Sequence, residues 1–134
     1  MFDENNCDAV GKLTLRLTVG ILILMHGIGK IMHPESLDFI GSNLSNIGLP
    51  SAIAYGVYVG EVIAPLMIIT GFHARIGGLL VAVNMIFAVV LAHSGDILSL
   101  TKHGGWALEL QAFYLLGGLS IALLGSGQFA VKPD

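Results

Sequence analysis

Four stretches of 18 to 21 mostly apolar residues constrain this chain more than any other feature. An α-helix needs about 20 such residues to cross ~30 Å of hydrocarbon, because each residue adds 1.5 Å. Pro34, the turn-rich segment Asn43–Pro50 and the short Gly71–Arg75 link punctuate them. The sequence therefore predicts an all-α integral membrane four-helix bundle with short loops, a single membrane domain over residues 1–134, with these spans: Leu13–Met32, Ala52–Phe72, Ile76–His93 and Trp106–Leu124.

The scarcity of charge supports the same interpretation. Charged residues make up 11% of the chain, against about 25% in soluble domains, and hydrophobic residues make up 54%. The net charge of −3 gives no basic surface for DNA or RNA, so no nucleic-acid partner is expected. One cysteine, Cys7, excludes an internal disulfide and any multi-cysteine metal site. The expected partner of most of the surface is a lipid bilayer.

The charge distribution also predicts an orientation. The first stretch is expected to be retained, because it is too long for a signal peptide and follows an acidic leader. Four spans then place both termini on one side of the membrane. Lys30 and Lys102 lie on the opposite side. The side of the termini has four basic residues: Lys12, Arg16, Arg75 and Lys132. This excess of positive charge favours cytoplasmic termini.

Ionisable residues inside the predicted spans are the candidate functional residues. A charged side chain in hydrocarbon costs at least ~2.5–3.5 kcal/mol on insertion scales, so it marks a functional or paired position. Most of these residues fall in the outer half of the membrane. The candidate catalytic residues are Glu61, His26 and Glu109. The candidate ligand-binding residues are Arg16, Lys30 and His93, together with Arg75 in the link between the second and third spans.

Glu61 is the central candidate of this group. It lies nine residues from the outer end of its span, about 13 Å deep and near the midplane. Pro65 follows four residues later and has no N–H, so the Glu61 carbonyl loses its helical partner. A basic side chain (Arg16, Lys30 or His26), water or a ligand must satisfy this position.

Other polar residues have simpler explanations. Lys30 can extend to the interface, and Asn84 is expected to form an interhelical hydrogen bond. No metal-binding spacing is present, and haem is not expected, although His26 and His93 lie at similar depth. Small residues stand at every fourth position of the second span. They favour packing within the bundle, and association into a homo-oligomer stays an alternative.

A series of short motifs resembles the DoxX family (DoxD/DoxX-like) of small four-helix membrane proteins. The resemblance covers about residues 13–131, and it departs from the family pattern at the tail, Gln128–Val131. Each motif is short, and the specificity comes from their order and spacing. The motifs are Arg16-Leu17 with Gly20, His26-Gly27 with Lys30, Ile47-Gly48-Leu49-Pro50, Gly60-Glu61 with Gly71 and Arg75, His93-Ser94-Gly95, Gly104-Gly105-Trp106 with Glu109, and Gly125-Ser126-Gly127.

The resemblance implies a multi-pass protein of the cytoplasmic (inner) membrane of a bacterium or archaeon, linked to redox work. The family is named after an archaeal terminal quinol oxidase. Its members include subunits of thiosulfate:quinone oxidoreductase and proteins of oxidative-stress or thiol-homeostasis systems. A quinone is accordingly a candidate ligand, and the electrons are expected to come from a redox partner protein or directly from a small reductant.

Three functional hypotheses follow. The first is a quinone-linked subunit of an oxidoreductase, in which Glu61 or Glu109 moves protons, His26 donates to a quinone oxygen, and Arg16 or Lys30 holds negative charge. The second is a small-molecule transporter or permeation protein, suggested by a midplane carboxylate beside a broken backbone bond. The third is a non-catalytic accessory or assembly subunit. The sequence leaves open whether the chain is itself an enzyme.

Overall fold

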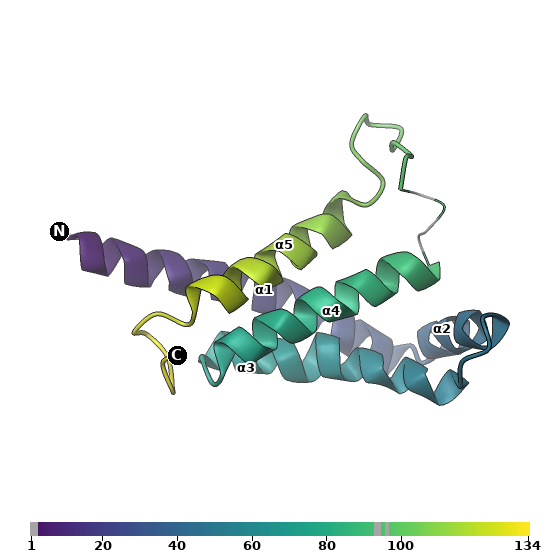
Figure 1. Ribbon diagram of the computed structural model, residues 1–134, viewed down its shortest axis with the longest axis horizontal. Helices are drawn as coiled ribbons and strands as arrows, with labels where there is room; N and C mark the ends of the chain where they lie inside the picture. The colour runs from purple at the N-terminus through teal and green to yellow at the C-terminus, as the bar shows by residue number, and fades with distance from the viewer. Residues whose placement is uncertain (1–2, 93–94, 96) are drawn as a thin grey trace.

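The computed structural model describes residues 3–92, 95 and 97–134, and their regular elements are all helical. The long elements run along the molecule, with the start of α1 and the C-terminal tail at the same end and α2 at the opposite end (Figure 1). α1 packs against α3 and α5, and α4 packs against α3 and α5. The buried core lies between them and includes Val19, Ile23, Ile68, Val81 and Ile121.

The first predicted span is part of a longer helix. α1 runs from Glu4 to Met32, so it begins nine residues before the predicted start at Leu13 and ends where predicted. The Asp3 carboxylate accepts a hydrogen bond from the Asn6 amide at 2.8 Å. Such an N-cap satisfies one of the free N–H groups of the first turn, which explains the early start.

The second predicted span is helical but irregular. It consists of a 3₁₀-helix, Ser51–Gly56, a π-helical turn, Val59–Ile63, and α3, Ala64–Thr70. In the π-turn the Ala64 amide donates to the Val59 carbonyl, five residues back. The turn stands directly before Pro65, where the missing N–H was expected to disturb the helix.

The third predicted span is α4, Ala74–Ala92. The fourth is shorter than predicted, because α5 runs from Glu109 to Leu124 and Trp106–Leu108 lie outside it. Trp106 instead pairs with Leu100 in an isolated bridge and donates its indole N–H to the Ile97 carbonyl at 2.7 Å. Sixteen residues extend about 24 Å, less than ~30 Å of hydrocarbon.

Within the described residues, three helical elements are therefore long and apolar enough to cross a membrane: Glu4–Met32, Ser51–Thr70 and Ala74–Leu91. α5 is a shorter apolar helix. A fourth span and the cytoplasmic side of the termini stay predictions.

The connection after α1 contains a helix that was not predicted. α2 runs from Glu35 to Asn46, so the turn-rich segment expected over Asn43–Pro50 is confined to its last four residues. Leu37, Gly41 and Leu44 are buried on one face of α2, which packs on the 3₁₀-helix. The polar residues of its other face lower the average hydrophobicity, which is why a search for apolar stretches does not find it.

Candidate functional site

A cavity of about 670 Å³ lies between α1, α2, the broken second span, α4 and α5. Its walls are mainly apolar, with Ile23, Leu44, Val57, Val83, Phe87 and Leu91 among them. Eight polar or ionisable residues also line it: His26, Lys30, Glu35, Ser36, Glu61, Asn84, Gln111 and Tyr114. A few polar groups in an apolar cavity of roughly 300–1,000 Å³ are typical of small-molecule sites.

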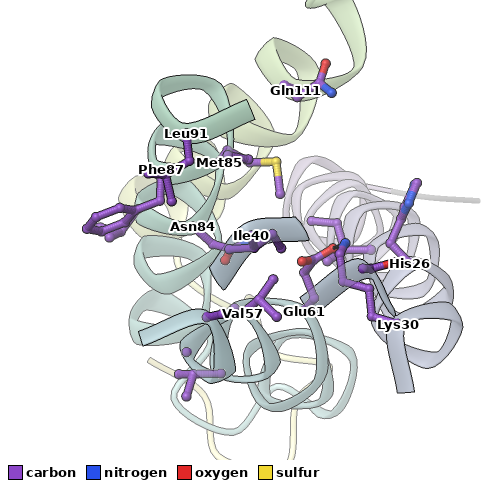
Figure 2. Close-up of a pocket in the computed structure, with 18 of the residues that line it drawn as sticks. His26, Lys30, Ile40, Val57, Glu61, Asn84, Met85, Phe87, Leu91 and Gln111 are labelled. Atoms are coloured by element: carbon purple, nitrogen blue, oxygen red, sulfur yellow. Dashed lines mark hydrogen bonds and ion pairs between the residues drawn. The ribbon is translucent and has the colours of Figure 1, made fainter. Parts of the chain in front are cut away.

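The central polar feature is an ion pair between α1 and the π-turn. Lys30 Nζ donates to Glu61 Oε1 at 2.6 Å, with the Glu61 side chain 6% exposed and that of Lys30 23% exposed. Figure 2 shows both side chains reaching toward each other at the cavity. Of the partners considered for Glu61, the structure therefore selects Lys30 over Arg16 and His26.

The backbone around Glu61 explains its placement. An added Cβ on Gly27 would overlap the Glu61 carbonyl, so only glycine lets α1 approach the π-turn so closely. Lys30 stands three residues after Gly27 and so lies on the same face of α1. The close approach of the two backbones therefore brings Lys30 within reach of Glu61.

His26 lies beside this pair. Its side chain lines the cavity although the residue as a whole is exposed, and its ring meets Tyr114 edge-on with centroids 5.8 Å apart. Tyr114 belongs to α5 and is buried. The structure thus gathers His26, Lys30 and Glu61 at one cavity.

The remaining candidates lie elsewhere. Glu109, at the start of α5, is exposed and does not line the cavity. His93 lies outside the described residues. Arg16 and Arg75 do not line the cavity, and both contact the C-terminal tail.

The Arg16 guanidinium donates hydrogen bonds to four backbone carbonyls. It donates to Ile68 at 2.9 Å and Ile69 at 3.1 Å in α3, and to Ser126 at 3.0 Å and Phe129 at 2.7 Å in the tail. Arg16 is 1% exposed. In this structure it joins α1, α3 and the tail rather than facing the cavity.

Arg75 has a comparable arrangement at the start of α4. It donates to the carbonyls of Ala122 and Leu123 at the end of α5 and to the backbone oxygen of Asp134, at 2.9–3.0 Å. A cation at a helix C-terminus satisfies free carbonyls and complements the helix dipole.

Sequence reasoning overlooked Gln111 and Tyr114 and misjudged Asn84. Asn84 Nδ2 is buried and has no hydrogen-bond partner among the described residues, in contrast to the expected interhelical bond. Gln111 and Tyr114 are three residues apart and so share a face of α5. The sequence signal that could have found Gln111 and Tyr114 is an uncharged polar side chain within an otherwise apolar stretch.

Comparison with known proteins identifies relatives. The DoxX family model matches residues 11–94. A Bacillus subtilis (strain 168) protein named "Putative oxidoreductase CatD" is 32% identical over 130 residues, which is 96% of this chain and 90% of that protein. A Mycobacterium tuberculosis (strain ATCC 25618 / H37Rv) protein named "Uncharacterized membrane protein Rv3486" is 28% identical over 81 residues, 59% of this chain and 48% of that protein. No solved structure matches.

Proposed function

This chain belongs to the DoxX family, and from that premise we propose that it is the quinone-binding membrane subunit of an oxidoreductase, with the cavity at Lys30 and Glu61 as the quinone site. The observation that carries the proposal is an ion pair at one wall of a largely apolar cavity of about 670 Å³. The name of the Bacillus subtilis relative, an oxidoreductase, agrees with a redox role.

The residues present fit a quinone. A quinone ring is flat and apolar and carries oxygens that accept hydrogen bonds. The apolar walls fit the ring and exclude water, and Lys30 Nζ provides N–H donors for an oxygen. Asn84 and Gln111 add uncharged polar side chains to the lining of the same cavity.

The ion pair also provides a path for protons. A bound quinone takes up two electrons and two protons when it is reduced to the quinol. Lys30 Nζ and Glu61 Oε1 are 2.6 Å apart, so a proton can move between them within an existing hydrogen bond. His26, exposed at the edge of the cavity, can exchange protons with the surroundings. The electrons come from a reduced partner protein.

Binding of 1,4-naphthoquinone to the purified protein in lipid nanodiscs tests the proposal. Titration against empty nanodiscs separates binding from partition into lipid. Wild type is expected to bind saturably. Glu61→Gln is expected to bind about 10-fold more weakly, because a neutral carboxamide holds the Lys30 ammonium, the donor to the quinone oxygen, less firmly than the charged partner does (~1.5–3 kcal/mol for a charged hydrogen bond). Asp38→Asn makes the same chemical change on α2, outside the cavity lining, and is expected to bind like wild type.

Two results would contradict the proposal. One is the absence of saturable binding by wild type, which favours the transport or accessory hypothesis. The other is an equal effect of Glu61→Gln and Asp38→Asn, since the cavity would then have no special part in binding.

A further inference from the structure

Tyr114 is a buried residue in the wall of the cavity, and its hydroxyl has no partner among the described residues. It belongs to α5 and is 6% exposed. The hydroxyl is also absent from the polar atoms of the described chain that are closed off without a hydrogen bond, which are Asn84 Nδ2 and Gln111 Oε1. It is therefore open to the cavity that the residue lines. Because a buried tyrosine hydroxyl usually has a hydrogen-bond partner, we expect the partner in the cavity.

Two glycines fix the position of Tyr114. Gly117 and Gly118 follow it by three and four residues, so all three share a face of α5. An added Cβ would lie 2.9 Å from the Val19 side chain at Gly117, and 2.7 Å from the Gly78 carbonyl at Gly118. This face of α5 therefore lies close against α1 and α4, and the tyrosine ring on it is directed into the interior.

Tyr114 meets α1 one helical turn from the ion pair. Its ring contacts the ring of His26, which shares a face of α1 with Lys30 four residues later (Figure 2). Four residues rise by about 6 Å along a helix. Gly27, the residue after His26, lies against the Glu61 carbonyl. The tyrosine and the ion pair thus adjoin the same short segment of α1, at one cavity.

We propose that Tyr114 is a ligand-binding residue whose hydroxyl donates a hydrogen bond to an oxygen of the bound quinone. The inference rests on the proposed quinone site and adds a donor on α5 to the Lys30 ammonium on α1. A quinone oxygen accepts hydrogen bonds, and a phenolic hydroxyl donates one without bringing a charge into the cavity. The edge-on contact with His26 holds the tyrosine ring in place.

The test compares a quinone with an analogue that has no oxygen. The probes are 1,4-naphthoquinone and naphthalene, titrated into the protein in lipid nanodiscs with empty nanodiscs as the reference. Wild type is expected to bind the quinone at least about 10-fold more tightly, because its oxygens can accept hydrogen bonds from the cavity.

Tyr114→Phe removes the hydroxyl and keeps the ring. It is expected to weaken binding of 1,4-naphthoquinone about 3- to 10-fold, the range that one hydrogen bond gives, and to leave naphthalene binding unchanged. Tyr55→Phe makes the same chemical change at a residue that is 64% exposed and outside the cavity lining. This control is expected to bind both probes like wild type.

Fluorine NMR observes Tyr114 without replacing it by another residue type. Protein labelled with 3-fluorotyrosine carries the label at the three tyrosines of the chain. The signals that disappear in Tyr55→Phe and Tyr58→Phe leave the third for Tyr114. Because the fluorine is next to the hydroxyl, this signal is expected to shift when 1,4-naphthoquinone binds, and to shift much less with naphthalene. The measurement decides even where Tyr114→Phe does not fold.

The outcomes separate the two proposals. If Tyr114→Phe weakens neither probe or both equally, or if the Tyr114 signal responds equally to both, the tyrosine contact is refuted and the quinone site remains. If wild type binds 1,4-naphthoquinone no more tightly than naphthalene, the quinone site fails as well.

Discussion

Removing Lys30 while Glu61 stays in place is expected to destabilise the fold strongly. Lys30→Met keeps much of the aliphatic chain and deletes the ammonium group. The Glu61 carboxylate, 6% exposed, then loses the partner 2.6 Å away. At an effective dielectric constant near 20, the lost Coulomb attraction is about 6 kcal/mol before desolvation is subtracted.

Removing one partner of a buried pair typically costs ~3–5 kcal/mol, because the remaining charge stays buried without compensation. The expected loss for Lys30→Met is in this range.

Reversible unfolding of the purified protein in mixed micelles measures this change in the free energy of unfolding. Lys12→Met is the matched control, because Lys12 forms a pair of similar length (2.8 Å) with Asp8, whose side chain is 59% exposed. That surface pair is expected to contribute at most ~0.5 kcal/mol. The double variant Lys30→Met/Glu61→Leu is expected to be more stable than Lys30→Met alone. Equal losses for Lys30→Met and Lys12→Met would refute this reasoning.

The close contact and the arginine anchor give two further predictions. Gly27→Ala is expected to lower the free energy of unfolding by ~1–3 kcal/mol, because the new Cβ overlaps the Glu61 carbonyl. Gly29→Ala, with no neighbour within 4 Å, is expected to stabilise α1 by up to about 1 kcal/mol in the same assay, and a reversed order would contradict the packing. Arg16→Met removes the bonds that join the tail to α1 and α3. Amide hydrogen exchange at Val131, in the tail, is therefore expected to accelerate at least 10-fold, with Arg16→Lys intermediate. Unchanged exchange would show that the tail is held by other contacts.

The positions of the apolar helices could be predicted from the sequence because lipid imposes a length and a composition on any helix that crosses it. That constraint located the end of α1 at Met32 and the whole of α4 within two residues. It did not find α2, which is amphipathic, or the early start of α1, which depends on the cap at Asp3.

The candidate site was predictable to a similar degree. His26 and Lys30 share a helical face and Glu61 lies at a compatible depth, so their meeting at one cavity follows from helix geometry. The partners of Arg16 could not be predicted. They are backbone carbonyls, which every residue has, and only the folded chain determines which ones come within reach.

The four bonds of Arg16 set an order of events during synthesis. Its acceptors in α3 lie 52 and 53 residues further along the chain, and those in the tail lie 110 and 113 residues further. At roughly 5–20 residues per second, the last acceptor is made about 6 to 23 s after Arg16 itself. Until then only the two α3 acceptors are available to the guanidinium, so we expect α1 to reach its final depth when the tail arrives. Residues 126–129 thus complete the placement of the first helix.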